Sequence, residues 1–444
     1  MSFEAGTYRI EHLIKVGLLE IGDGYRAKNS ELSNIGIPFA RAANINDGFQ
    51  FDRADLFPTS DLTRVGNKVS RPGDVVFTSK GTVGRFALVG ETTPQFVYSP
   101  QLCFWRSLDH SVLLPEYLYY WMNSQEFLQQ VSYLKGQTDM ADYVSLRDQR
   151  KMAATIPSIK TQRDIVGVLK PIDDRIALLR ETNATLEAIA QTMFKSWFVD
   201  FDPVRAWQQG LVPEGMDQAT AVLFPDGFVN SELGAVPRGW QVEAIGDVVE
   251  GIFDGPHATP PEAGDGPVFL GIKNLTGTAL DLSDIRHIAE QDFAQWTRRV
   301  TPRSGDIVFS YEATLGFFAL IPDGLRCCLG RRLALIRPLA QEGYGHFWFH
   351  QLIAPPFQRL LEKHTIHGAT VNRIALKEFP RYPVLDPPGN VKAAFDAVAA
   401  PLWRRIHANQ AVAQSLIDVR DTLLPRLISG QLRLPEAEAL AAAA

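Results

Sequence analysis

The chain contains 444 residues, 45% hydrophobic and 21% charged, a composition typical of a soluble globular protein with two or three domains. Its net charge of -6 and pI near 5.9, with no excess of basic residues in 1–158 or 203–385, speak against a basic surface for nucleic acid. We see no signal peptide and no run of 18 apolar residues, and the three cysteines are too few for a disulfide framework, so we expect a cytoplasmic protein.

Residues 1–158 combine strand-like runs with turns rich in Gly, Pro and Asp. The run Gly73-Asp-Val-Val-Phe77 is typical of a strand that follows a tight turn. A short aromatic helix is predicted from Pro115 to Gln130, followed by Gly136-Gln-Thr138 and an extended stretch that ends at Pro157. The pattern predicts a first mixed α/β domain over these residues.

Residues 162–198 predict one long helix, within a central helical region at 159–205. Apolar residues recur there at steps of four and three, which is the period of a coiled-coil seam. At about 1.5 Å per residue the helix would be roughly 55 Å long. The predicted seam residues are Ile165, Leu169, Ile172, Ile176, Leu179, Asn183, Leu186, Ala190, Met193 and Trp197.

Residues 206–385 repeat the plan of residues 1–158. Arg71-Pro-Gly-Asp-Val-Val-Phe77 recurs as Arg303-Ser-Gly-Asp-Ile-Val-Phe309, with the two glycines 305 − 73 = 232 residues apart. Matches in one order at a nearly constant offset indicate an internal duplication, and they predict a second domain with its own aromatic helix from about Tyr344 to Lys363. Further matches at offsets of 230 to 232 are Phe39 with Phe269, Asn44 with Asn274, Gly84–Leu88 with Gly316–Leu320, and Gly136-Gln-Thr138 with Gly368-Ala-Thr370.

Residues 386–432 predict a second long helix, and we expect 433–444 to be a disordered tail. Arg405 interrupts the apolar seam, with Ile406 beside it as a substitute. Pro171 and Pro401 are 401 − 171 = 230 residues apart, which predicts a bend shared by the two helices. The predicted seam residues are Val391, Phe395, Val398, Leu402, Arg405, Asn409, Val412, Leu416, Val419 and Leu423.

We expect the two long helices to pair as an antiparallel coiled coil. Asn183 and Asn409 fall on equivalent seam positions, where a buried asparagine weakens the seam but fixes its register and partner. The alternative is two amphipathic helices packed on separate cores. Antiparallel pairing would place the two domains at opposite ends, so the predicted fold class is α+β. It consists of two mixed α/β domains in a pseudo-two-fold arrangement, separated by a long antiparallel two-helix coiled coil.

A pseudo-two-fold arrangement of unequal modules points to DNA. Proteins that read B-DNA as dimers place two half-sites about one helical turn, roughly 34–36 Å, apart, a distance that the long helices could span. Two similar but unequal modules on a rigid spacer predict a bipartite, asymmetric target.

Several segments resemble conserved regions of the specificity subunits of type I restriction–modification enzymes. The resemblance extends over nearly the whole chain and is most specific in the helices. It implies that residues 1–158 and 206–385 are target-recognition domains that bind double-stranded DNA. The segments are Pro157–Ile165, Leu179–Asn183, Phe194–Asp200, Ser231–Trp240 and Arg420–Gly430.

The resemblance also implies partners for the chain. We expect a complex with two methyltransferase (modification) subunits, and with restriction (motor-nuclease) subunits when the system cuts DNA. S-adenosylmethionine, ATP and Mg are then expected in the partner subunits, with no catalytic residue, cofactor or metal in this chain.

Candidate DNA-binding residues lie in two kinds of segment, the Gly-x-Thr stretches and the loops that flank the repeated strand. Glycine lets backbone approach a phosphate, while Gln, Thr, Asn, Arg and Lys supply hydrogen-bond donors for bases and phosphates. The alternative is that the glycines shape turns and the polar groups are solvated. The candidates are Ser79, Lys80, Arg85, Lys135, Gln137 and Thr138 in the first copy, and Tyr311, Arg331, Arg332, His367, Thr370, Asn372 and Arg373 in the second.

Three catalytic or metal-binding interpretations are rejected. His346 and His350 are one helical turn apart, but the matching stretch of the first copy has no histidine, so a packed aromatic helix is favoured over a zinc site. The adjacent Cys327 and Cys328 favour a core position over redox chemistry. Asp386-Pro-Pro-Gly389 lacks the aromatic residue that stacks a flipped base, and no nucleotide-binding glycine motif or Walker loop is present.

Two hypotheses therefore remain, a non-catalytic DNA reader and a coiled-coil scaffold that does not bind DNA. The two copies keep their helices but differ in the loop after the matched strand. Where the first copy has Lys80, the second has Glu312. A scaffold has no reason to diversify these loops, so the difference favours the reader.

Overall fold

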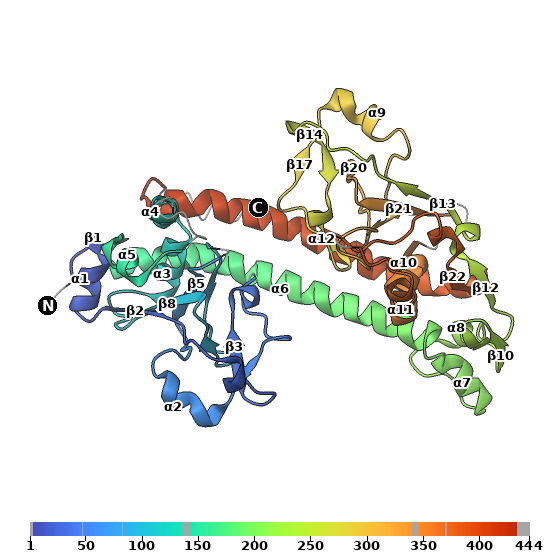
Figure 1. Ribbon diagram of the computed structural model, residues 1–444, viewed down its shortest axis with the longest axis horizontal. Coiled ribbons are helices and arrows are strands. Elements are labelled where there is room, and N and C mark those ends of the chain that lie inside the picture. Colours follow the sequence, from blue (N-terminus) through green and yellow to red (C-terminus); the bar gives the residue numbers. More distant parts are fainter. Residues whose placement is uncertain are drawn as a thin grey trace. The chain divides into compact units, whose positions relative to one another are not determined.

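The computed structural model describes residues 3–46, 48–81, 83–135, 143–339, 345–368 and 371–432, without the side chain of Lys135. The chain divides into two compact units. Unit 1 comprises Met1–Leu178 and Ser415–Ala444, and unit 2 comprises Leu179–Gln414. Each unit contains its own strands and a part of each long helix, α6 (Ile159–Phe198) and α12 (Gly389–Ile428) (Figure 1).

Unit 1 is built around a four-stranded antiparallel sheet. Its strand order is β2 (Leu19–Asp23), β8 (Leu102–Ser107), β5 (Asp74–Thr78) and β6 (Phe86–Leu88). A second sheet contains β4 (Leu56–Phe57), β3 (Ile37–Ala40) and β7 (Val97–Tyr98), in which β3 and β7 are parallel. The strand β1 (Gly6–Arg9) pairs with β9 (Ala153–Ile156). Every residue of β5 and β8 is buried, as in a strand covered on both faces.

Unit 2 has the same sheets in the same order. The four-stranded sheet runs β13 (Val249–Asp254), β21 (Leu333–Pro338), β18 (Ile307–Ser310), β19 (Phe318–Leu320), and the three-stranded sheet runs β17 (Arg286–His287), β14 (Ala263–Leu270), β20 (Cys327–Leu329). Again the pair β14–β20 is parallel, and β12 (Gln241–Ala244) pairs with β22 (Pro383–Asp386). Unit 2 adds the hairpins β10 (Phe228–Ser231) with β11 (Gly234–Pro237) and β15 (Leu275–Thr276) with β16 (Ala279–Leu280). The duplication seen in the sequence is thus a duplication of topology.

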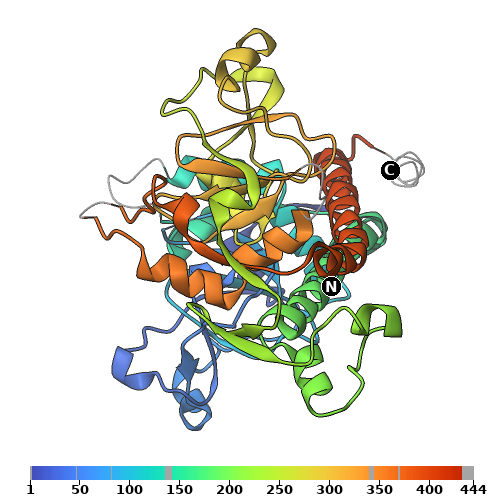
Figure 2. The same cartoon turned by 90° about the vertical axis from the view of Figure 1, so that its right-hand side faces the viewer.

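The predicted aromatic helix is two helices in each unit, so the single-helix prediction was wrong. Unit 1 has α3 (Pro115–Met122) and α4 (Gln125–Lys135), and unit 2 has α10 (Gly345–Ile353) and α11 (Pro355–Lys363), which lie beside the strands of unit 2 in Figure 2. Pro355 stands at the first turn of α11, where its missing N–H costs nothing, and it starts a new helix. The shorter helices are α1 (Ile10–Lys15), α2 (Leu62–Val65), α5 (Leu146–Lys151), α7 (Asp202–Gln208), α8 (Gln218–Ala221) and α9 (Phe293–Trp296).

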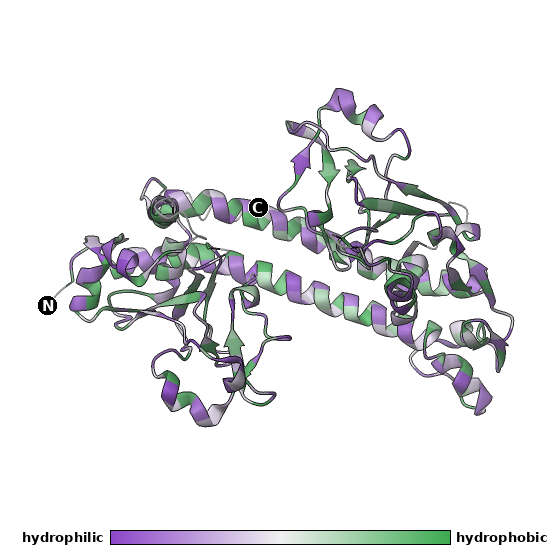
Figure 3. Ribbon diagram, in the orientation of Figure 1, coloured by the Kyte–Doolittle hydropathy of each residue, from purple (hydrophilic) through white to green (hydrophobic). Residues whose placement is uncertain are grey.

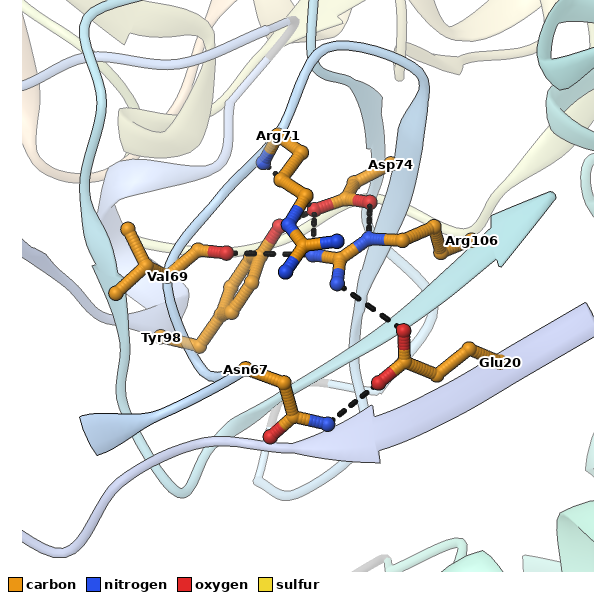
Figure 4. Close-up of polar contacts among 7 residues, drawn as sticks. All are labelled: Glu20, Asn67, Val69, Arg71, Asp74, Tyr98 and Arg106. Atoms are coloured by element: carbon orange, nitrogen blue, oxygen red, sulfur yellow. Dashed lines mark hydrogen bonds and ion pairs between the residues drawn. The ribbon is translucent and has the colours of Figure 1, made fainter. Parts of the chain in front are cut away.

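A buried ion pair explains the repeated Arg-x-Gly-Asp segment. Arg106 Nε and Nη2 donate to the Asp74 carboxylate at 2.6 and 2.8 Å, and Tyr98 OH donates to it at 2.6 Å (Figure 4). In unit 2, Arg337 Nε and Nη2 donate to Asp306 at 2.9 and 2.6 Å. The glycines before the aspartates have φ of +87° and +82°, a conformation that favours glycine. The repeat therefore preserves a turn and an ion pair of the scaffold.

The long helices pack against each other within each unit. In unit 1, Ile165, Leu169, Leu423 and Leu427 share one apolar core. In unit 2, Phe194 contacts Phe395 at a ring separation of 5.4 Å, and Asn409 Nδ2 donates to Asn183 Oδ1 at 2.8 Å. Because 183 faces 409 while 194 faces 395, the helices are antiparallel there. Hydrophilic and hydrophobic residues alternate along both helices (Figure 3).

The seam predicted for the second helix needs a correction. Val398 and Val412 are 40% and 45% exposed, and Arg405 is also exposed. Ala399, Ile406 and Ala413, each one residue later, are buried instead. The reason is that Phe395, Ala399 and Trp403 also pack into the core of unit 2, so the buried stripe follows the 3.6-residue period of an amphipathic helix. Within the described residues, no helix is both long and apolar enough to span a bilayer.

Candidate nucleic-acid interface

In unit 1, three polar segments from distant parts of the sequence meet at the end of β5. They are the loop after β5, the turn Ser99-Pro100-Gln101 before β8, and the residues that follow the first Gly-x-Thr stretch. Ser79 N donates to Gln101 O at 2.9 Å, and Val144 N donates to Ser79 O at 3.0 Å. The backbones of Lys80 and Tyr143 form an isolated antiparallel β-bridge.

Unit 2 brings the equivalent segments together in the same way. Tyr311 N donates to Arg332 O at 3.2 Å, and Ile374 N donates to Tyr311 O at 2.8 Å. Glu312 and Arg373 form the bridge that corresponds to Lys80 and Tyr143. In unit 2 the candidates Tyr311 and Arg332 therefore lie beside the segment of the candidate Arg373. In unit 1 the corresponding segment is described only from Tyr143 onward.

The turn before β8 or β21 has the same backbone bonds in the two units. Ser99 N donates to Ala40 O at 2.9 Å, and Gly330 N donates to Leu270 O at 2.7 Å. A glycine packs on each turn, because a Cβ on Gly24 would lie 1.9 Å from Ser99 O and a Cβ on Gly255 would lie 2.4 Å from Gly330 O. The backbone frame is thus fixed, while the side chains on the turn differ between units.

In unit 2 this region contains a strained backbone position and a pair of backbone hydrogen bonds between Ile366 and Arg373. Ala313 has a φ of +67°, which is rare for a residue with a Cβ, and its N–H donates to Asn372 O at 2.9 Å. Ile366 and Arg373 exchange two backbone hydrogen bonds of 2.9 and 3.0 Å, which close the base of the loop that contains the second Gly-x-Thr stretch. These bonds fix where the exposed side chains of the loop begin.

The candidates of the first copy have different environments. Ser79 is 1% exposed and its hydroxyl faces Gln101 O at 3.4 Å, so its side chain can act on DNA only by holding the loop. Lys80 is exposed, and exposed Arg85 donates from Nη1 to Ile45 O at 3.3 Å. The side chain of Lys135, together with Gln137 and Thr138, lies outside the described residues.

The candidates of the second copy divide in the same way. Tyr311 is buried and its hydroxyl donates to Arg331 O at 2.8 Å, so it supports the turn. The exposed or half-buried candidates are Arg331, Arg332, His367, Asn372 and Arg373. Thr370 lies outside the described residues.

A cavity of about 380 Å³ in unit 2 contains cationic residues that the sequence reading missed. Besides Arg331 and Arg332, it is lined by Lys273 and Arg286, with Asn274 and the ring of Phe269. Lys273 pairs with Asp284, and Arg286 pairs with Glu262 at 3.0 Å, but neither carboxylate belongs to the cavity lining. The wall is therefore basic although the composition is not. A signal for this region was available, because Asn274 repeats Asn44 and both accept a backbone bond at the start of a short helical turn.

The histidine and cysteines that were considered as metal or redox residues lie in apolar cores. His350 is 1% exposed against Phe194, Phe395 and Trp403, and burial lowers its pKa to about 3. Burial raises the pKa of Cys327 and Cys328 to about 12, which disfavours reactive thiolates.

The remaining rejected motifs also have structural roles. Asp386 ends β22 and α12 begins at Gly389, so the Asp-Pro-Pro-Gly stretch starts a helix. No group of three or more His, Cys, Asp or Glu that could hold a metal occurs among the described residues.

The comparisons with known proteins agree on one family. Residues 13–188 match the family described as Type I restriction modification DNA specificity domain. The HindI specificity subunit of Haemophilus influenzae is 23% identical over 86% of this chain and 92% of its own length. The MjaIX specificity subunit of Methanocaldococcus jannaschii is 24% identical over 82% and 78%. A crystal structure of the type I S subunit from M. genitalium, 14% identical, shares the fold at a TM-score of 0.52 over 95% of both chains. Residues 13–188 thus match a type I DNA specificity domain, and the chain is similar over most of its length to specificity subunits of type I restriction enzymes.

Proposed function

We propose that this chain reads a bipartite, asymmetric sequence in double-stranded DNA, with one half-site for each unit. The supporting observation is the shared frame described above. Equivalent backbone hydrogen bonds gather the same three polar segments at the same end of the same sheet, yet the side chains on them differ. Lys80 and Gln101 of unit 1 are replaced by Glu312 and Arg332 in unit 2. Direct reading of bases needs a fixed scaffold with exchangeable hydrogen-bonding side chains.

The chain itself is a non-catalytic subunit in this proposal. Residues 1–158 and 206–385 act as target-recognition domains, and the long helices at 159–205 and 386–432 join them, with Asn183 and Asn409 setting the register of the helix pair. Two methyltransferase subunits and the restriction subunits would bind this scaffold and would carry S-adenosylmethionine, ATP and Mg. The similarity to specificity subunits of type I restriction enzymes supports this division of labour.

The near-neutral composition predicts that DNA affinity depends on those partners. Phosphate contacts supply most of the non-specific affinity for DNA, and neither half of the chain has excess basic residues. We therefore expect the isolated chain to bind DNA weakly and to bind tightly and specifically only with methyltransferase subunits. A titration of labelled duplex at physiological salt measures both states, and nanomolar specific binding by the isolated chain would contradict the expectation.

Methylation mapping tests the proposed function. Methylated bases are sequenced in a host with and without this gene, in the presence of the methyltransferase gene. We expect a split motif that disappears when the gene is deleted. If the chain is a scaffold that does not read DNA, the same motif will persist whichever recognition domain is exchanged for that of a related subunit.

A further inference from the structure

The turn Gly330-Arg331-Arg332 places two arginines on the wall of the cavity in unit 2. The cavity measures about 380 Å³ and lies between this turn, the β14 region and Arg286. Arg331 is exposed at the tip of the turn, and its side chain makes no hydrogen bond or ion pair with any described residue. Arg332 is less exposed, with 35% of its side chain accessible. The two neighbours therefore offer one exposed and one partly buried guanidinium to the same cavity.

Arg332 lies near an acidic residue on the adjoining loop. Its Nε lies 3.9 Å from Glu312 Oε2, and the Glu312 side chain is 28% exposed. Glu312 is itself fixed, because its backbone bridges to Arg373 and the next residue, Ala313, bonds to Asn372 O. Arg332 Nε is buried without a hydrogen bond, and the rest of the guanidinium also makes none to the described residues. A partly buried guanidinium whose donors are unused can bind a ligand with two neighbouring acceptors.

The equivalent position in unit 1 carries a different chemistry on the same backbone. Tyr311 N donates to Arg332 O, and Ser79 N donates to Gln101 O, so Gln101 is the counterpart of Arg332. Lys80 stands where unit 2 has Glu312, so unit 1 offers no carboxylate at this place. Gln101 Oε1 accepts from Ala42 N at 3.1 Å, which leaves its amide donors for other partners. The two units therefore present different hydrogen-bonding side chains on a turn with the same backbone hydrogen bonds.

In DNA, the ligand with two neighbouring acceptors on one edge is guanine. Its O6 and N7 face the major groove together, and a bidentate arginine contact to them is the commonest specific contact. We infer that Arg332, beside Glu312, reads a guanine in the half-site of unit 2, while the neighbouring Arg331 binds a backbone phosphate. This inference rests on the proposed function and names the base and the residue that carry part of it.

The test uses the complex of this chain with its methyltransferase subunits and duplexes that carry the mapped motif. Each guanine is replaced in turn by 7-deazaguanine, which lacks the N7 acceptor, or by inosine, which keeps the major-groove acceptors. At one guanine we expect 7-deazaguanine to weaken binding by wild type about 10- to 100-fold, whereas inosine changes it little. Arg332→Gln should show no further loss with 7-deazaguanine at that position, because the contact is already absent.

Two protein controls separate reading from folding and from general charge. Arg332→Gln installs the residue that unit 1 carries on the same turn, so the backbone is expected to be retained. Arg326→Gln removes one positive charge from the other end of β20 and should leave the pattern of guanine sensitivity unchanged. Arg331→Gln should weaken all duplexes alike and reduce the salt dependence by about one phosphate contact.

The outcomes distinguish this inference from the proposed function. If Arg332→Gln weakens every duplex equally, or if its effect adds to that of 7-deazaguanine at all positions, Arg332 does not read guanine, although the chain still reads DNA. Exchange of unit 2 for that of a related subunit identifies the half-site that unit 2 reads. If that half-site contains no guanine, Arg332 again does not read guanine. A wild-type complex that binds unrelated duplexes as tightly as the motif would overturn both proposals.

Discussion

The helices α3 and α10 contact the long helices through equivalent residues, but the contact is a hydrogen bond to an ion-paired carboxylate in unit 1 and an aromatic one in unit 2. Tyr120 and His350 correspond at 350 − 120 = 230, and Asp173 and Trp403 correspond at 403 − 173 = 230. Tyr120 OH donates to Asp173 Oδ2 at 2.7 Å, and Arg420 Nη1 lies 3.0 Å from Asp173 Oδ1. In unit 2, Trp403 Nε1 lies 3.5 Å from His350 Nε2, with the rings 5.9 Å apart.

This difference makes the two helix contacts non-interchangeable. A carboxylate like that of Asp173, placed among the aromatic rings of unit 2, would be a buried and unpaired charge, which is strongly unfavourable. A tryptophan in place of Asp173 would leave Arg420 and Tyr120 in unit 1 without their acceptor. Although the two repeats share a backbone plan, side-chain chemistry can therefore ensure that each short helix packs against the long helix of its own unit.

The largest expected effect is on the aromatic contact of unit 2. Trp403 is 2% exposed and packs on Phe349 at a ring separation of 4.9 Å, so Trp403→Ala should lower the free energy of unfolding by about 3–5 kcal/mol. Asp173→Ala, at the equivalent and partly exposed position, should cost about 1–2 kcal/mol. Equilibrium denaturation of the full chain measures both variants. Equal losses would show that the two contacts do not differ in the way described.

The sequence predicted the parts of the fold that depend on local pattern. The duplication was visible because the turn before the strand needs Gly73 or Gly305 and the ion pair needs Asp74 or Asp306 at a fixed spacing. The long helices were visible because their apolar period is sustained over many turns. Both signals are contained within a few tens of residues.

Contacts between distant residues were not predictable from these patterns. Arg106 and Arg337 gave no sign of their aspartate partners, and Gln101 was not chosen although it is the counterpart of Arg332. The seam prediction was wrong at Val398 and Val412, because the core of unit 2 also packs on that helix and shifts the buried stripe by one residue. In each case the contact or the burial depends on a segment that is distant in the sequence, which a local pattern cannot identify.

The next prediction asks whether the two units read DNA independently. Arg373→Ala should weaken methylation only where unit 2 reads, and Gln137→Ala, which lies outside the described residues, only where unit 1 reads. Loss of a good base contact costs about 1–3 kcal/mol, roughly a tenfold to hundredfold loss of affinity. Methylation mapping of both variants in cells measures occupancy of each half-site, with Asn183→Ala as a control that alters the helix pair without choosing among bases. Equal damage to the two half-sites would mean that the units are not independent.

The carboxylate of Asp396 at the start of α10 predicts that the stability of unit 2 depends on pH. Asp396 accepts hydrogen bonds from Phe347 N at 2.7 Å and His346 N at 3.2 Å, and burial raises its pKa to about 7. In unit 1 the acceptor near the start of α3 is the amide of Gln162, which accepts from Leu114 N at 2.9 Å and does not titrate. Burial lowers the pKa of His346 to about 4 and that of His350 to about 3.

The sign of each contribution follows from the folded and unfolded pKa values. The histidines stabilise unit 2 above an unfolded pKa of roughly 6.5, and this stability is lost as the pH falls towards the folded values. Asp396 acts oppositely, because its contribution is present at low pH and is lost as the pH rises through about 7. Asp396→Asn removes that opposing contribution, so between about pH 4.5 and 6 the stability should rise more steeply with pH, by about 1.4 kcal/mol per unit. Denaturation at several pH values measures the slope. Gln162→Ala should shift stability without changing the slope, and an unchanged slope in Asp396→Asn would contradict the assignment.

The smallest expected effect separates the ionic contact from the aromatic one by salt. The side chains of Arg420 and Asp173 are 27% and 25% exposed, so solvent ions can screen their attraction. Arg420→Gln should lower the free energy of unfolding by about 1 kcal/mol at low salt, since Tyr120 still donates to Asp173, and by less in about 1 M NaCl, where the screening length is near 3 Å. Trp403→Phe should show a loss that salt does not reduce, because burial of aromatic surface is not an interaction between charges. Paired denaturation curves at the two salt concentrations measure the difference. If the Arg420→Gln loss is the same at both, the contact in unit 1 depends on packing of the arginine stem, and the ionic description of that contact is wrong.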